Sequence, residues 1–210
     1  MSDAVAVAVL AKAPLPGFTK TRLIPVLGAD GAAALQARLI ARAVATACAA
    51  EIGPVTLWAT PDERHPVLQE IAARLAVTLA RQRDGDLGAR MLAAIEVART
   101  PVLVIGTDCP ALSPDHLRKA ADILRGGTDA VLIPAEDGGY ALIGLRMAEP
   151  ALFSDMRWST PGVMAETRRR LERLGMHWQE PVTLWDVDLP ADLERLRRVG
   201  LHELIPSPDP

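Results

Sequence analysis

The sequence has little of what several protein classes require. Its 210 residues include two cysteines, which form no Cys-x-x-Cys pair, and four histidines without metal-ligand spacing. We therefore expect reduced thiols and a cytoplasmic location instead of a disulfide framework. The 23 basic residues are outnumbered by 26 acidic ones, so no basic surplus indicates a nucleic-acid partner. Only 3% of the residues are aromatic, which leaves Ala, Val, Leu and Ile to build the core.

Long apolar runs and familiar fingerprints are also missing. No run approaches the ~20 apolar residues that a membrane-spanning helix needs, so we expect no membrane partner. The GxxxxGK[ST] and GxGxxG phosphate motifs are absent, and so is the GxSxG turn of the α/β-hydrolases. A phosphate site in this protein must therefore be built in another way.

Short Val-rich runs alternate with longer Ala- and Leu-rich segments, which predicts strands that alternate with helices. The expected strands are residues 4–11, 54–60, 77–82, 101–108, 129–136, 140–146 and 182–188. The expected helices are residues 28–51, 61–75, 113–127, 159–175 and 190–200, and one that follows the N-cap residue Asp86. Such alternation requires crossover connections and a mainly parallel sheet, with an antiparallel excursion after residue 129. We predict one three-layer α/β/α domain over residues 1–210, with a loose tail from residue 203.

The stretch AKAPLPGFTKTRL (11–23) follows the first predicted strand and is more elaborate than a simple reversal needs. Gly17 lets the backbone approach a ligand closely, and Lys12, Lys20 and Arg22 supply positive charge. Free N–H groups together with a following helix can hold phosphate oxygens. This opening loop therefore indicates a phosphate site, and an ordinary surface loop with solvated cations is the alternative.

Carboxylates follow two other predicted strands. Asp108 comes directly after an apolar strand, where a buried charge needs a partner of opposite charge. A Mg²⁺ ion that also binds phosphate could be this partner. Asp186 and Asp188 alternate on an extended segment, so they share a face and either could approach Asp108. The alternatives are that Asp108 caps a turn beside Pro110 and that Asp188 caps the last helix. Cys109 has no second cysteine or histidine nearby and is expected to be a buried structural residue.

The turn EDGGY (136–140) is the fourth polar stretch at a strand end. Gly138 and Gly139 indicate a backbone that turns sharply or lies against a ligand. Asp137 is placed to act as a general base or to bind a hydroxyl group, and Tyr140 offers a ring to a sugar or a base. A two-glycine hairpin turn is the alternative.

Six motifs resemble, in this order, a family of small bacterial GT-A-fold proteins in the nucleotide-diphospho-sugar transferase superfamily. The motifs are AKAPLPGFTKTRL, GDLGARM, GTDCP, DGGYALIGL, WSTPGV and DVDLPADL. Some members of this family are described as arsenosugar-biosynthesis glycosyltransferases, and related families are the phospholactate guanylyltransferases and the molybdenum-cofactor nucleotidyltransferases. The resemblance covers nearly the whole chain and implies a Rossmann-like GT-A fold with a nucleotide or sugar-nucleotide ligand.

The resemblance also implies roles for individual residues. Those implied to bind the nucleotide are Lys12, Gly17, Lys20, Arg22, Gln82, Gly85, Asp86, Gly88 and Arg90. Asp108 and Asp188 are implied to hold Mg²⁺ or Mn²⁺. GT-A sugar transferases carry DxD at this position, whereas GTDCP has a single aspartate, which is typical of the related nucleotidyltransferases. The catalytic candidates are Asp137 and Lys20, and the substrate-binding candidates are Gly138, Gly139, Tyr140, Trp158, Ser159 and Thr160.

These features predict a metal-dependent transferase that moves a glycosyl group from a nucleotide-diphospho-sugar to a small acceptor. One alternative is nucleotidyl transfer, in which a nucleoside triphosphate is joined to a phosphorylated small molecule and pyrophosphate is released. Another is a nucleotide-binding protein without turnover. We expect the segment DMRWST (155–160) to form a flap over the acceptor. The sequence predicts no particular base, sugar, acceptor or oligomeric state.

Overall fold

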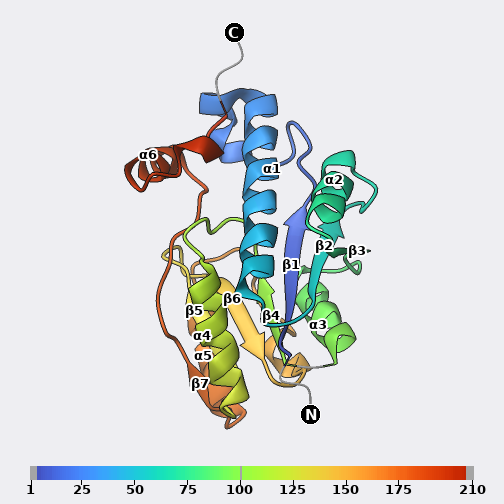
Figure 1. Ribbon diagram of the computed structural model, residues 1–210. Helices are drawn as coiled ribbons and strands as arrows, with labels where there is room; N and C mark the ends of the chain where they lie inside the picture. Colours follow the sequence, from blue (N-terminus) through green and yellow to red (C-terminus); the bar gives the residue numbers. More distant parts are fainter. Residues whose placement is uncertain (1–3, 100, 207–210) are drawn as a thin grey trace.

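The computed structural model describes residues 4–99 and 101–206, and a seven-stranded sheet runs through them in the order β3-β2-β1-β4-β6-β5-β7 (Figure 1). The strands are β1 (Ala6–Lys12), β2 (Val55–Thr60), β3 (Thr78–Arg81), β4 (Val102–Ile105), β5 (Ala130–Pro134), β6 (Tyr140–Leu145) and β7 (Trp178–Gln179). β6 is antiparallel to both of its neighbours, and the other pairs are parallel. The mixed, mainly parallel sheet predicted from the sequence is confirmed.

Helices cover both faces of this sheet. One face carries α1 (Ile24–Ala50), α2 (Pro66–Arg74) and α4 (Pro114–Arg125), and the other carries α3 (Leu87–Ala98) and α5 (Val163–Arg173). α6 (Pro190–Arg198) packs against the N-terminal part of α1. Short 3₁₀ helices lie at η1 (Thr21–Leu23), η2 (Pro150–Leu152) and η3 (His202–Leu204). The predicted three-layer α/β/α arrangement is therefore confirmed.

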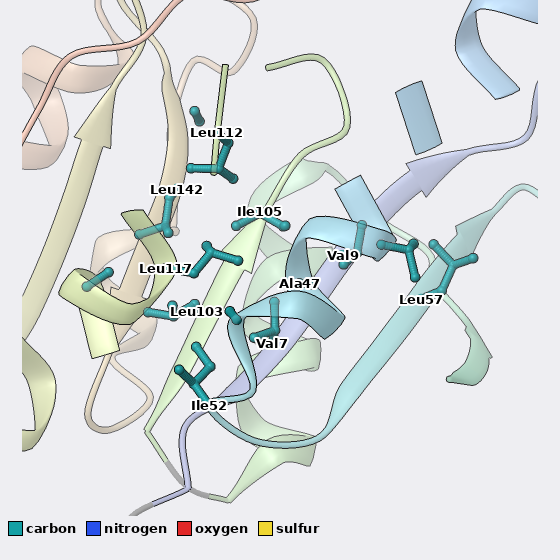
Figure 2. Packing of buried hydrophobic residues seen from close by; sticks show 14 of the residues in the cluster. Val7, Val9, Ala47, Ile52, Leu57, Leu103, Ile105, Leu112, Leu117 and Leu142 are labelled. Carbon is teal, nitrogen blue, oxygen red and sulfur yellow. The ribbon is translucent and has the colours of Figure 1, made fainter. Parts of the chain in front are cut away.

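The alternating side chains of β1 divide the core into two parts. Val7 and Val9 belong to the cluster under α1 and α4, together with Leu103 and Ile105 of the neighbouring β4 (Figure 2). Ala6 and Ala8 face the opposite layer, with α3 and α5. All fully buried members of the first cluster are Ala, Val, Leu or Ile, as the scarcity of aromatic residues predicts. Each large side chain of this kind contributes about 1.5–3 kcal/mol by burial, which fixes the helices on the sheet.

Helix α1 corrects two predictions. By length and composition alone, the segment Thr21–Ala50 is long and apolar enough to cross a membrane, whereas we expected no such run. In the fold it is a core helix, because Leu35 and Ile40 are fully buried and pack within the protein. The helix also begins at Ile24, earlier than predicted, and Gly28 interrupts it with a φ of 72°.

The predicted strand 182–188 does not form. Its only ladder contact among the described residues is an isolated bridge from Leu184 to Ala135, and β7 lies earlier in the chain. The segment crosses two strand ends, since Leu184 pairs at the end of β5 whereas Val187 N donates to Asp108 O beyond β4. An extended segment that changes partners in this way cannot form a regular ladder.

Two other boundaries differ from the prediction. α2 begins at Pro66 and not at residue 61, with His65 as its N-cap residue. The tail was expected to be loose from residue 203, but Leu204 is buried and Arg38 donates to Ile205 O at 2.8 Å. Residues 207–210 of the predicted tail lie outside the described residues.

Gly144 in β6 provides a test of this packing. A Cβ atom there would lie 2.5 Å from Val131 Cγ1 and 2.6 Å from Leu103 Cδ2. Gly144→Ala should therefore lower the free energy of unfolding by about 1–3 kcal/mol, as overpacked cores do. Gly106→Ala is the control, because no atom lies within 4 Å of its Cβ position. Urea denaturation measures both, and equal stabilities would contradict the packing described here.

Candidate functional site

A cleft of about 960 Å³ opens where the parallel strands end and β6 begins. Ligands of open α/β sheets bind at this edge. The predicted site residues that line the cleft are Lys12, Lys20, Arg22, Gln82, Arg90, Asp108, Asp137, Gly139, Tyr140, Trp158, Ser159, Thr160 and Asp188. The predicted residues that do not line it are Gly17, Gly85, Asp86, Gly88 and Gly138. The fold therefore brings the predicted charged and aromatic side chains together, whereas most of the predicted glycines shape the surrounding backbone.

The opening loop folds back on itself at the end of β1. Lys12 Nζ donates to Phe18 O at 2.5 Å, which closes the loop. Gly17 has a φ of 80°, a conformation that favours glycine, and no other atom lies within 4 Å of its Cβ position. Glycine is therefore required here by the turn. The Phe18 side chain is 67% exposed and lines the cleft.

Two cations of this loop contact the two carboxylates predicted to bind metal. Lys20 Nζ lies 2.7 Å from Asp108 Oδ1 and donates to Val187 O at 2.6 Å. The Lys20 side chain is only 5% exposed, whereas Asp108 is 53% exposed. Arg22 pairs with Asp188 at the more open side of the cleft. The loop is thus joined to the end of β4 and to the late 186–188 segment.

The buried side chains of Gln36 and Thr107 connect Asp108 to α1. Gln36 of α1 donates to Thr107 Oγ1 at 3.1 Å, and the Thr107 hydroxyl lies 3.5 Å from Asp108 Oδ1. Both residues are buried. Burial raises the pKa of the adjacent Cys109 to about 12, so its thiol stays protonated and is a poor nucleophile or metal ligand.

The end of β3 and the start of α3 form the other wall. Gln82 Nε2 donates to Ala11 O and Trp58 O, so both hydrogens of the side-chain amide are used in hydrogen bonds to the backbone. The Oε1 atom can accept a hydrogen bond from a ligand. Asp86 caps α3 by accepting from Ala89 N at 2.8 Å, which confirms its predicted role as N-cap residue. Arg90 donates to Gly85 O at 3.0 Å and has no carboxylate partner among the described residues.

Two predicted site glycines, Gly88 and Gly138, lie against Trp158 and Pro161. A Cβ atom at Gly88 would lie 2.6 Å from Trp158 Cζ2, and one at Gly138 would lie 2.2 Å from Pro161 O. The segment 158–161 therefore packs against α3 on one side and against the turn before β6 on the other. The predicted helix start at Ser159 is wrong, because its φ of 60° is not helical and α5 begins at Val163.

Arg170 anchors the loop 151–155, which precedes Trp158. Its side chain is 8% exposed and pairs with Glu166 at 2.7 Å. Its guanidinium also donates to the backbone carbonyls of Ala151, Leu152, Ser154 and Asp155. The loop before Trp158 is thus fixed through its carbonyl groups to α5.

The remaining part of the cleft is acidic. Asp137 is exposed and accepts from Gly139 N at 2.8 Å, which leaves its second oxygen for a hydroxyl group or a cation. Burial, followed by the charges of Asp137 and Asp108, raises the pKa of Asp186 from 3.8 to about 6. Neither Asp137 nor Asp186 makes an ion pair with any residue in 4–99 or 101–206. Burial also raises the pKa of Tyr140, whose hydroxyl lies 3.8 Å from Met91 Sδ.

Sequence reasoning missed the contacts of Trp185, Arg195 and Glu136 at this end of the cleft. The Arg195 guanidinium stacks 4.4 Å from the centre of the Trp185 ring and pairs with Glu136 at 2.6 Å. All three line the cleft. Arg195 lies 59 residues from Glu136, so no local pattern could have indicated the pair.

Comparison with known proteins shows the family of this chain. The family model described as "Uncharacterized protein conserved in bacteria (DUF2064)" matches residues 26–160. The chain belongs to this family. A nucleotide-diphospho-sugar transferase candidate from Desulfovibrio desulfuricans G20 is 30% identical, with a TM-score of 0.85 over 95% of this chain and 88% of that one. The resemblance inferred from the motifs is therefore confirmed.

Two more distant structures share the fold. CMP:2-keto-3-deoxy-manno-octonic acid synthetase, complexed with CTP, is 13% identical with a TM-score of 0.58 over 95% of this chain and 99% of that one. The 4-diphosphocytidyl-2C-methyl-D-erythritol synthase of Anaerococcus prevotii DSM 20548 is 12% identical with a TM-score of 0.60, over 94% and 96%. No protein with a curated description matches the sequence. These likenesses confirm the predicted fold class.

The carboxylates at the centre of the cleft could hold a divalent cation. Burial is the main cause of the raised pKa of Asp186, and the charges of Asp137 and Asp108 add to it, so these carboxylates lie near one another. Within residues 4–99 and 101–206, no group of three or more His, Cys, Asp and Glu side chains could hold a metal. Mg²⁺ commonly uses one or two carboxylates and completes its shell with phosphate oxygens and water. Asp108 with Asp186 or Asp188 would supply such a pair.

The role of Arg170 can be tested by stability. Arg170→Met leaves several carbonyls and part of Glu166 unpaired, so the free energy of unfolding should fall by about 3 kcal/mol. Arg169→Met is the matched control, because Arg169 pairs with the same Glu166 but is 71% exposed, and it should cost less than about 1 kcal/mol. Urea denaturation compares the two, and a similar loss in both variants would exclude the anchoring role.

The charge of Asp186 gives a pH-dependent prediction. Since its pKa is raised from 3.8 to about 6, the folded state binds more protons there than the unfolded state, and stability falls as the pH rises through this range. Asp186→Asn should remove this loss and raise the melting temperature at pH 7.5 with EDTA present. Asp84→Asn, at an exposed carboxylate, is the control. A lower melting temperature for Asp186→Asn at pH 7.5 would contradict a destabilising effect of the Asp186 charge.

Proposed function

We propose that this protein is a transferase that binds a nucleotide-diphospho-sugar in the cleft and transfers the glycosyl group to a small hydroxyl acceptor. The observation that carries this proposal is the distribution of charge along one cleft. Lys12, Lys20, Arg22 and Arg90 lie toward the ends of β1 and β3, and acidic and aromatic side chains lie toward β5 and β6. The 30% identity to the transferase candidate of Desulfovibrio desulfuricans G20 supports the same assignment.

The donor side would bind the diphosphate. Lys12 and Arg90 have no carboxylate partner among the described residues, so their charges are available to phosphate oxygens. Asp108, with Asp186 or Asp188, would hold the divalent cation, which supplies positive charge to the departing diphosphate. Gln82 lines the same cleft, and its Oε1 atom could accept a hydrogen bond from the base or the ribose.

The acceptor side would activate a hydroxyl group. Asp137 has one carboxylate oxygen that Gly139 N does not use, and this oxygen can take the hydroxyl proton. The new glycosidic C–O bond then forms as the bond from the sugar carbon to the diphosphate breaks. The nucleoside diphosphate leaves with the bonding electron pair. The flap residues Trp158, Ser159 and Thr160 line the space in which the sugar and the acceptor would lie.

Nucleotidyl transfer is the second candidate, and one feature favours it. The opening loop carries three cations, which is more positive charge than a diphosphate needs and suits a triphosphate. In that reaction a phosphorylated acceptor attacks the α-phosphorus and pyrophosphate leaves. The two reactions differ in their released product, so the same binding assay followed by product analysis separates them.

A thermal-shift screen tests the proposal. Nucleoside triphosphates, nucleoside diphosphates and sugar nucleotides are each added with Mg²⁺, with Mn²⁺ or with EDTA. A sugar nucleotide at a hundredfold excess over its dissociation constant should stabilise the protein by ~2.7 kcal/mol when metal is present. Asp108→Ala should lose the metal-dependent part of the shift, and Glu172→Ala, at an exposed position of α5, should keep it.

The outcomes separate the alternatives. A triphosphate that binds more tightly than every sugar nucleotide, with pyrophosphate released from an acceptor mixture, would favour nucleotidyl transfer. A shift that Asp108→Ala does not change would remove Asp108 from the metal site. No shift with any nucleotide would contradict the whole proposal.

A further inference from the structure

The charges at the centre of the cleft neutralise one another in pairs. Asp108 and Asp188, which are assigned to the metal, pair with Lys20 and Arg22, which are assigned to phosphate. By contrast, Lys12 donates to the Phe18 carbonyl and has no carboxylate partner among the described residues. Lys20 and Arg22 therefore have to leave their present partners before they can bind phosphate oxygens.

Lys20 occupies the space beside Asp108 that a metal would use. Its ammonium group lies 2.7 Å from Asp108 Oδ1 and 2.6 Å from Val187 O, and the side chain is almost fully buried. An ammonium group and a divalent cation cannot share this position, because they carry the same sign of charge. Metal binding at Asp108 Oδ1 must therefore displace Lys20 from a site where it is desolvated and paired.

We propose that the cleft binds a divalent cation and a polyphosphate as one complex, and that it has low affinity for either alone. On binding, Asp108 and Asp188 exchange Lys20 and Arg22 for the metal, and the two cations pass to the phosphate oxygens. This inference rests on the proposed function, since it names the ionic form in which the nucleotide is taken. It adds that the opening loop changes its partners when the ligand binds.

The charge balance explains why neither ion suffices. A metal ion alone would leave Lys20 and Arg22 without counter-charges beside a second cation. A polyphosphate alone would withdraw the same two cations and leave Asp108 and Asp188 next to another anion. When both bind, each of these four side chains keeps an opposite charge beside it. The two ligands should therefore raise each other's affinity by the same factor, as linkage requires.

A test uses Mn²⁺ and inorganic pyrophosphate as probes, with binding followed by calorimetry on the intact chain. Wild-type protein should bind free Mn²⁺ weakly, and pyrophosphate should raise the Mn²⁺ affinity by roughly 10-fold or more after correction for their complex in solution. Lys20→Met frees Asp108, so it should bind Mn²⁺ alone roughly 10-fold more tightly than wild type does, while its affinity for the manganese–pyrophosphate complex falls. Changes of opposite sign in one variant are the signature of exchange.

Two further variants serve as a control and as an independent repeat of this test. Lys12→Met should weaken the binding of the complex but leave the affinity for Mn²⁺ alone unchanged, because Lys12 has no carboxylate partner in the described part of the chain. Arg22→Met repeats the test through Asp188 at a side chain that is 67% exposed, where folding is not at risk. A melting curve of each variant confirms that it is folded.

The results distinguish this inference from the proposed function. Equal Mn²⁺ affinity in wild type, Lys20→Met and Arg22→Met would overturn the exchange, even if nucleotides bind in the thermal-shift screen. Independent binding of Mn²⁺ and pyrophosphate would overturn it as well. The opposite changes in Lys20→Met, together with no response to any nucleotide, would support the exchange as a property of polyphosphate binding and contradict the nucleotide assignment.

Discussion

Three segments that are distant in the sequence meet at the ammonium group of Lys20. Lys20 belongs to the loop after β1, Asp108 follows β4, and Val187 lies in the late segment that crosses both strand ends. Because the side chain of Lys20 is 5% exposed, its charge requires these partners, and removing one from such a pair is costly. The positions of the loop, of Asp108 and of the late segment therefore depend on one another. The centre of the cleft is defined by this dependence.

A steric constraint joins the two sides of the cleft. The flap places Trp158 against Gly88 on the side of α3, and Pro161 against Gly138 in the turn that carries Asp137. Arg170 fixes the loop before the flap through its carbonyl groups. A movement of this segment would therefore alter the α3 side and the Asp137 side of the cleft together, which would suit the proposed reaction between two substrates.

The sequence predicted the strands and the polar stretches at their ends, because hydrophobic periodicity and turn residues are local signals. It did not predict the path of residues 182–188, since that segment bonds to two different strands and no local pattern records such a change. Gly88 was assigned to the nucleotide by the family resemblance, and Gly138 to a sharp turn or a ligand by the Gly-Gly pair. A glycine reveals that space is needed, but not what fills it. The contact of Arg195 with Trp185 and Glu136 is long-range, so no local pattern could indicate it either.

Asp186 keeps a partly buried charge near Asp137 without an ion-pair partner among the described residues, and this charge costs stability at neutral pH, mainly through its burial and in part through repulsion from Asp137. A fold selected for stability alone would place an amide or a lysine at one of these positions. Sites that bind substrates often retain such unfavourable groups, because the ligand relieves them. A cation near Asp186, or a hydroxyl donor at Asp137, would remove the repulsion on binding. The charge of Asp186 that weakens the free protein would thus provide part of the energy with which a cation binds.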